Sequence, residues 1–288
     1  MNFIYKIPGY FLLLLGGFCL SWGGLIVRSF DTSNPWQILF LRSFFFFIGV
    51  TIFLISIYKK NTIKAMQKAG LPGFFGGFVM SFSFIAFVFA MMNTTVANVV
   101  FIISTQTMFL ATFGYFYLKE KISLVGFLSI LLAMGGITIM VGDSIYSGNL
   151  FGNVIALVIP ISFSILVMIV RKNSNLDLVP AIWYASVLSL SYSLLMVKSF
   201  DFTSHDIFMG FLLGVPQLTF GFVCITIGSR TTRSLTIGLL MLTETIFAPL
   251  WVWLFINEIP PISVFFGGSV IILAIILKSL DSKPVKST

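Results

Sequence analysis

Apolar runs of about 20 residues, the length that a helix needs to cross a bilayer, fill nearly the whole chain and constrain its fold more than any other feature. The weakest division between them contains only Asn93, Thr94 and Thr95. The sequence therefore predicts an all-α integral membrane protein with ten transmembrane helices. Breaks at Gly, Pro, Asn and charge clusters place these spans at residues 10–27, 36–57, 70–91, 95–118, 122–141, 149–170, 178–197, 207–228, 235–256 and 262–279.

The composition leaves almost nothing for a soluble domain. Charged residues make up 9% of the chain and hydrophobic residues 58%, whereas a soluble domain carries about 25% charge. A net charge of +8 would favour nucleic acid in a soluble protein. Here most charges flank apolar segments, so we expect the lipid bilayer as partner and no nucleic acid. The first span reads as an uncleaved anchor, because no cleavage site follows it.

The distribution of basic residues tests the number of spans. One set of alternating loops carries fourteen of the 17 Lys and Arg residues, and the other carries only Arg28 and Lys198. A miscounted helix would scramble this alternation. Because cytoplasmic loops hold the excess of basic residues, we predict that both termini are cytoplasmic.

The second half of the sequence repeats the first. An offset of 138 residues places Glu120 over Glu258 and Gln106 over Glu244, and an offset of 143 places Arg28 over Arg171. The predicted halves, residues 1–143 and 144–288, hold five spans each. An odd number of spans gives the halves opposite orientations, and inverted repeats place a substrate site near the midplane between them. We therefore expect two inverted five-helix repeats within one transmembrane domain.

Two ionisable residues lie within predicted spans, where charge is costly and usually functional. Glu244 lies roughly 14 Å and Arg42 roughly 9 Å into its span, counted from opposite sides of the membrane. Glu244 is either a substrate-binding residue with a cation-binding or proton-coupling role, or a protonated group hydrogen-bonded between helices. Arg42 is either an anchor for a substrate carboxylate or phosphate, or a structural ion-pair partner, or a side chain reaching the headgroups.

Further polar and aromatic residues within the spans are candidates for substrate binding. Gln106 is symmetric to Glu244, and its amide either contacts substrate or joins helices. Aromatic side chains can line a cavity or bind an amine through cation–π attraction, although at span ends they usually anchor the interface. The remaining candidates are Trp22, Asn98, Trp183, Tyr184 and Gln217.

The sequence contains none of the motifs that would indicate an enzyme. A P-loop and a metal-binding HExxH motif are both absent. Cys19 and Cys224 form neither a metal cluster nor a disulfide framework. We expect no catalytic residues, no metal and no cofactor.

Three segments together resemble the EamA branch of the drug/metabolite transporter superfamily. They are FCLSWGGLIVRS (residues 18–29), NPWQILFLRSFFFF (residues 34–47) and TETIFAPLWVWLFINEIP (residues 243–260). The chain departs from the family pattern at Gln106-Thr107, where a Pro-Val pair is common, and at Thr245, where proline is common. The resemblance implies ten helices in two inverted repeats, with helices one to four and six to nine around a cavity and helices five and ten supporting it.

The buried acid and base favour a plasma-membrane carrier, in the inner membrane if the source is bacterial. Its predicted substrate is a small organic molecule, an amino acid or a related amine-bearing compound, carried by a monomer or homodimer without a cofactor. The alternative is an exporter of drugs or lipophilic cations, which a like charge at Arg42 disfavours. A third possibility is a membrane scaffold or receptor with a packed interior.

Overall fold

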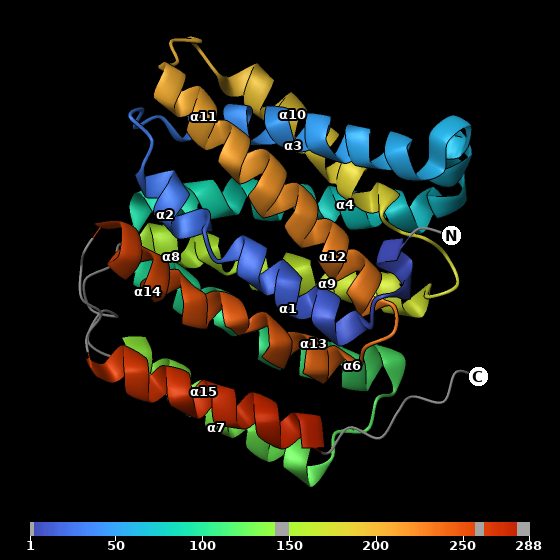
Figure 1. Cartoon of the computed structure of the whole chain (residues 1–288), viewed down its shortest axis with the longest axis vertical. Coiled ribbons are helices and arrows are strands. Elements are labelled where there is room, and N and C mark those ends of the chain that lie inside the picture. The colour runs from blue at the N-terminus through green and yellow to red at the C-terminus, as the bar shows by residue number, and fades with distance from the viewer. Residues whose placement is uncertain (1–2, 142–149, 257–261, 281–288) are drawn as a thin grey trace.

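A computed structural model describes residues 3–141, 150–256 and 262–280, and every regular element in these ranges is a helix (Figure 1). In the first half the helices are η1 (Phe3–Lys6), α1 (Gly9–Leu20), α2 (Gly23–Arg28), α3 (Pro35–Tyr58), η2 (Lys59–Asn61), α4 (Thr62–Asn93), α5 (Val96–Ser104), α6 (Gln106–Leu118) and α7 (Leu124–Val141). In the second half they are α8 (Leu150–Ala156), α9 (Val158–Lys172), α10 (Pro180–Met196), α11 (Ser204–Leu212), η4 (Leu213–Thr219), α12 (Phe220–Ser229), α13 (Ser234–Met241), α14 (Thr243–Ile256) and α15 (Ile262–Leu280).

By length and hydropathy, six helical stretches in the described residues can cross a membrane, and three further apolar helices are shorter. One of the six, Pro35–Asn93, is 59 residues long and covers two predicted spans. Positive φ angles at Lys59 and Gly70 interrupt it. The prediction of an all-helical membrane protein is confirmed, whereas the arrangement as ten inverted-repeat helices stays a prediction.

The short polar stretch between the third and fourth predicted spans divides two helices, as predicted. Thr94 is extended, with φ −142° and ψ 177°, and ends α4. The Thr95 side chain then caps α5 by accepting a hydrogen bond from the Asn98 backbone N–H at 3.2 Å. A hydroxyl that satisfies one free N–H group favours a helix start, so two polar residues suffice for this division.

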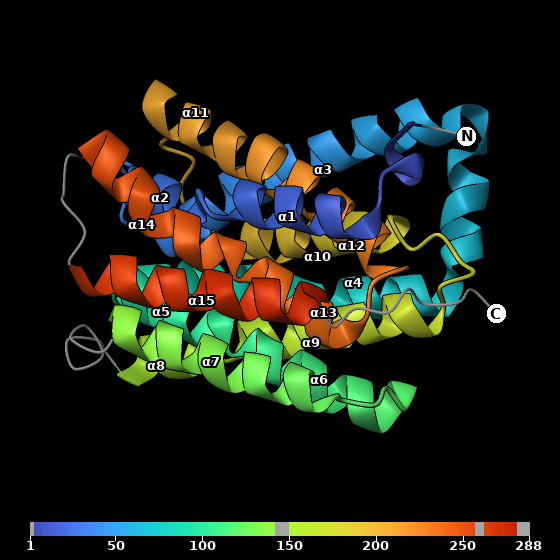
Figure 2. The ribbon, with the colours of Figure 1, turned by 60° about the horizontal axis from the view of Figure 1, so that its bottom comes forward.

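The helices lie roughly side by side in one bundle (Figures 1 and 2). α7 packs on α15 along one edge, and α10 packs on α3 and α4 at the opposite edge. α1 lies between them, in contact with α12 and α13. The peripheral position of α7 and α15 agrees with the supporting role that the family resemblance implies for the fifth and tenth helices.

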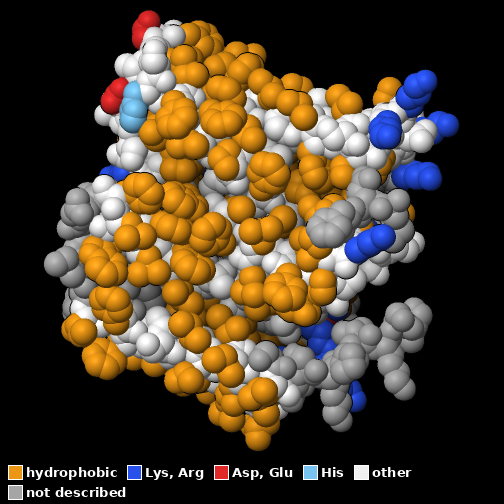
Figure 3. All heavy atoms as spheres, viewed as in Figure 1, with side chains coloured by type: hydrophobic (Ala, Val, Ile, Leu, Met, Phe, Trp, Pro, Cys, Tyr) orange, Lys and Arg blue, Asp and Glu red, His pale blue; other side chains and the backbone are white. Residues whose placement is uncertain are grey.

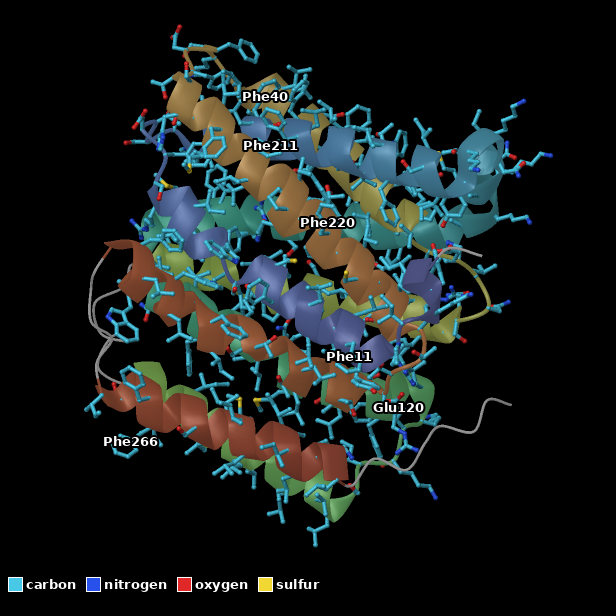
Figure 4. The ribbon with its side chains drawn as sticks, in the orientation of Figure 1. Phe11, Phe40, Glu120, Phe211, Phe220 and Phe266 are labelled. Atoms are coloured by element: carbon cyan, nitrogen blue, oxygen red, sulfur yellow. The ribbon has the colours of Figure 1, made fainter. Side chains whose placement is uncertain are left out.

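The surface has the polarity of a membrane protein. Hydrophobic side chains cover most of the face in Figure 3, and Lys and Arg side chains gather at one end of the bundle. Phe11, Phe211, Phe220 and Phe266 are exposed on the outside of the bundle (Figure 4). Such a surface is suited to lipid, and its basic end corresponds to the side predicted to be cytoplasmic.

The contact between α4 and α10 depends on a glycine. A Cβ at Gly77 would lie 2.5 Å from the Ala181 carbonyl oxygen and 2.6 Å from the Tyr184 Cβ. We expect Gly77→Ala to destabilise the protein by about 1–3 kcal/mol, because overpacked backbone must shift. Gly135→Ala on α7, where a Cβ meets nothing within 4 Å, is the matched control. Thermal unfolding in detergent measures both; equal midpoints for the two variants would contradict the prediction.

Candidate functional site

Arg42, Gln106 and Glu244 line one buried cavity between the helices. Arg42 comes from α3, Gln106 from the first turn of α6 and Glu244 from the first turn of α14. Residues of α1, α4, α5, α9, η4, α12 and α13 complete the wall. Three polar side chains predicted to share a site therefore do meet, and they come from both halves of the chain.

Arg42 faces the interior and not the headgroup region. Its side chain is only 2% exposed, and its Nη1 donates to the Phe84 carbonyl oxygen at 3.2 Å. Its Cζ lies 4.7 Å from the centre of the Phe87 ring, in cation–π contact. Its Nε has no hydrogen-bond partner. The guanidinium is thus held in place while its Nε donor is left for a ligand.

Glu244 is 8% exposed, and its carboxylate accepts no hydrogen bond from any described residue. No ion pair within 4.0 Å joins it to Arg42. Both residues line the same cavity, so opposite charges face one space without neutralising each other directly. A direct structural ion pair and a glutamate hydrogen-bonded between helices are therefore not what the structure shows.

Two glutamine side chains add neutral polar groups to this wall. Gln106 is buried, and its amide makes no hydrogen bond with the described residues. Gln217 donates from Nε2 to the Leu20 carbonyl oxygen at 3.3 Å, while its Oε1 has no partner. Buried polar groups without partners are uncommon in proteins, and their concentration at one cavity is typical of a ligand site.

The sequence analysis missed two residues of the wall, Phe84 and Phe87, which contact Arg42 from α4. With 34 Phe residues in the chain, no signal distinguished these two from lipid-facing ones. Ser83, which precedes Phe84 in α4, adds a hydroxyl to the cavity and was not among the predicted residues. A guanidinium in one apolar span predicts aromatic neighbours on an adjacent span, but not which span.

Helix breaks position Gln106 and Glu244. The sequence predicted continuous spans here, but α5 ends before Thr105 and α13 ends before Leu242. The Thr105 hydroxyl donates to the Ile102 carbonyl at 2.6 Å, and the Thr243 hydroxyl donates to the Leu240 carbonyl at 2.8 Å. These contacts match at the offset of 138 residues. Each interruption is a single residue within an otherwise continuous helical span, and it lies next to a cavity residue.

The cavity is much smaller than a substrate site requires. Its volume is about 40 Å³, close to the roughly 30 Å³ that one water molecule occupies in the liquid. Phe84, Phe163 and Phe222 fill the surrounding space, and Phe84 packs edge-on against Phe222. Aromatic side chains thus leave little room beside the three polar groups, and a cavity open to one side stays a prediction.

The remaining predicted site residues lie outside this wall. Asn98 is buried and donates to the Thr94 hydroxyl at 3.3 Å. Trp183 donates from Nε1 to the Thr51 hydroxyl at 3.0 Å, and its ring packs edge-on against Tyr184. Trp22 lines a separate apolar pocket. Substrate contact by these four residues stays a prediction.

Comparisons with known proteins place this geometry in a family. Residues 7–142 match the model of the EamA-like transporter family. The chain belongs to this family. A protein of Clostridium kluyveri named "Uncharacterized transporter" is 24% identical, and the match covers 97% of each chain. A solved crystal structure superposes on this EamA-like protein with a TM-score of 0.80 at 14% identity, covering 97% of this chain and 99% of the other, and shows a shared fold.

The family match and the Clostridium kluyveri relative identify the protein as a multi-pass membrane transporter. The family consists of transporters, which agrees with the sequence prediction that the chain is not an enzyme. The groups of His, Cys, Asp and Glu in the described residues form no cluster suited to a metal ion.

Polar contacts between the halves close the basic end of the EamA-like protein. Arg171 pairs with Glu120, which Figure 4 labels at this end, and also donates to the Thr232 carbonyl. The second Glu120 oxygen accepts from the Ser234 backbone N–H at 3.1 Å. A charged pair with additional hydrogen bonds is stronger than an isolated surface pair, so this cluster holds the end shut.

A similar polar cluster joins the halves at the other end. The Asp206 carboxylate on α11 accepts from the Asp31 backbone N–H at 2.8 Å. It also completes a capping box with Thr203, whose hydroxyl donates to the Asp31 carboxylate at 2.7 Å. Polar contacts therefore join the two halves at both ends of the bundle.

The EamA-like protein places two arginines equivalently at its opposite ends. Arg28 donates to the Thr94 carbonyl at 2.8 Å, and Arg171 donates to the Thr232 carbonyl. The two arginines are 143 residues apart and the two threonines 138, which are the offsets found in the sequence. Each arginine thus binds the backbone just before a helix that carries a cavity residue.

A tyrosine contact at the basic end predicts a pH dependence. The hydroxyls of Tyr5 and Tyr58 donate to Asp177 Oδ2 at 2.6 and 2.5 Å. Burial and the Asp177 carboxylate raise the pKa of Tyr5 above its ordinary 10.0. As the pH rises above about 10, the unfolded chain loses the Tyr5 proton first, so stability falls.

We expect this loss of stability above pH 10.0 to be smaller in Tyr5→Phe, which has no phenolic proton to lose. Thermal unfolding midpoints measured across this pH range test the prediction. Tyr10→Phe, at an exposed position of α1, is the matched control. The prediction is wrong if Tyr5→Phe retains the full pH dependence of the wild type.

Proposed function

We propose that the protein is a secondary transporter that moves an amino acid or a related amine-bearing compound across the plasma membrane by alternating access. The observation that carries this proposal is that Arg42 and Glu244 face one cavity without pairing with each other. A zwitterion supplies a carboxylate for the guanidinium and an ammonium for the carboxylate. Its binding would neutralise two buried charges at once, whereas a singly charged ligand leaves one uncompensated.

The surrounding groups fit the same class of ligand. The Gln106 amide and the unpartnered Gln217 Oε1 can bind an ammonium or a polar side chain. In this proposal Glu244 binds the substrate ammonium or exchanges a proton during the cycle, and Arg42 binds the carboxylate.

The proposal includes the architecture that alternating access needs. Residues 1–143 and 144–288 form two inverted five-helix repeats in one transmembrane domain, with both termini cytoplasmic and the active form a monomer or homodimer. Its support is the matched arginine contacts and helix breaks of the two halves. The 40 Å³ cavity is then the occluded form, and one polar end cluster opens at a time.

Uptake into reconstituted vesicles tests the proposed function. Vesicles preloaded with one amino acid or amine at a time are mixed with a trace of the labelled compound, and the transient accumulation is recorded. We expect counterflow for at least one zwitterion, and none after Arg42→Met. Counterflow of monovalent lipophilic cations alone would favour an exporter of such cations, and no counterflow with the full panel would count against a carrier of this class.

A further inference from the structure

A second and much larger pocket lies on the side of the bundle. Its volume is about 500 Å³, within the range of about 300–1,000 Å³ for small-molecule sites. Phe18 and Trp22 form one side, Met209 and Leu212 the other, and Phe255 the outer rim. Two of the substrate-binding candidates from the sequence, Trp22 and Gln217, line this pocket.

The pocket opens towards lipid. Phe18 and Phe255, which line the pocket, are exposed hydrophobic side chains. Trp22 stacks on Trp251 with ring centres 3.9 Å apart and packs edge-on against Phe255, which makes one wall aromatic and rigid. A pocket lined mostly by apolar side chains is suited to an apolar group of a ligand.

Its inner end is polar, because Gln217 lines both this pocket and the charged cavity. Gln217 follows Pro216 in η4, a π-helical turn, and π-helical turns are frequent at functional sites. The Nε2 group binds the Leu20 carbonyl at the break between α1 and α2, whereas Oε1 has no partner. An unpartnered buried acceptor is costly, and a ligand with an N–H donor relieves that cost.

We propose that this pocket binds a single-chain amphiphile with an amine head. The alkyl body lies between Trp22 and Leu212, and the head donates a hydrogen bond to Gln217 Oε1. The adjoining cavity holds both Glu244 and Arg42, so the unpartnered acceptor at Gln217, and not net charge, selects a head with an N–H donor. This site does not depend on the proposed transport function, since binding here requires no charge at Arg42 and no conformational cycle.

Photo-crosslinking tests the pocket directly. The purified protein in phosphatidylcholine nanodiscs is incubated with a primary alkylamine that carries a diazirine near the end of its chain, and adducts are located by mass spectrometry. We expect adducts within residues 18–29 and 209–217. Adducts spread evenly over exposed residues of α7 and α15 would show ordinary partitioning into lipid and overturn the proposal.

Two substitutions and a matched control give the result its specificity. Leu25→Trp fills the pocket from α2 and Met209→Trp fills it from α11, so either is expected to reduce labelling by about tenfold. Leu15→Trp places the same side chain on α1 at an exposed position outside the pocket and should leave labelling unchanged. Undiminished labelling in both pocket variants, with normal elution on size exclusion, would overturn the proposal.

The polar end is tested by changing the head of the ligand. Gln217→Met keeps the side-chain length and removes the acceptor. We expect it to weaken binding of the primary amine by about tenfold. A trimethylammonium analogue has no N–H donor, and the substitution should change its binding little. Equal losses for both probes would mean that Gln217 does not bind the head. Competition by lysophosphatidylethanolamine, which has one acyl chain and the same ammonium donor, would identify a membrane lipid as the source of the ligand.

Discussion

Glu244→Gln is expected to abolish substrate-driven transport while the protein still folds. The amide keeps the shape of the carboxylate and removes a charge whose burial is costly, so folding should not suffer. Removing one partner of a buried charge interaction costs about 2–5 kcal/mol, or roughly 30-fold or more in binding. Counterflow in vesicles and thermal unfolding in detergent measure the two effects separately.

Asp201→Asn is the control for this variant, because it removes an equivalent charge from an exposed loop. Transport at the wild-type rate in Glu244→Gln would eliminate both the ammonium-binding and the proton-coupling roles. If the variant still binds substrate but transport no longer responds to a proton gradient, then coupling is the role of Glu244. If binding itself is lost, then Glu244 binds the substrate ammonium.

Arg42→Lys is expected to weaken substrate binding by about tenfold or more, although it preserves the charge. The guanidinium presents a planar set of donors that fits a carboxylate in two places, and the ammonium of lysine is a single point charge. Lysine also cannot maintain the contacts that position Arg42, which are the Phe84 carbonyl and the Phe87 ring.

A decarboxylated analogue of the substrate distinguishes recognition from stability. If Arg42 binds the substrate carboxylate, Arg42→Lys should weaken binding of the parent compound more than binding of the analogue. Direct binding to purified protein, for example by calorimetry, measures both affinities. Equal losses for the two ligands would mean that Arg42 stabilises the closed protein and does not contact the substrate.

The hydrophobicity of the chain made the membrane fold predictable. The free-energy cost of burying a charge in a span made the site predictable. Apolar runs of this length form membrane-spanning helices, in which every backbone polar group is hydrogen-bonded. Charges such as Arg42 and Glu244 are costly within a span and are usually functional. The sequence therefore indicated the helices, the division at Thr94 and Thr95, and the meeting of Arg42, Gln106 and Glu244. The contacts of Arg28 and Arg171 follow the same offsets as the sequence repeat.

The details of the site depend on packing that no local pattern encodes. The breaks at Thr105 and Leu242 contain neither glycine nor proline, and both residues keep helical backbone angles. The aromatic residues that close the cavity have the same local pattern as those that face lipid. The lateral pocket is formed by α2, α11 and α14, which are distant in sequence, so it becomes visible only when the helices are assembled.

The matched arginine contacts at the two ends have an energetic consequence. Arg28 and Arg171 bind equivalent carbonyls, and each end is further held by a carboxylate. A carrier slows down if one of its conformers is much more stable than the other, because each cycle must then climb that difference. In the proposed alternating-access cycle, similar contacts at both ends would keep the outward-open and inward-open forms close in free energy, so that a small concentration gradient of the substrate would set the direction of net flow.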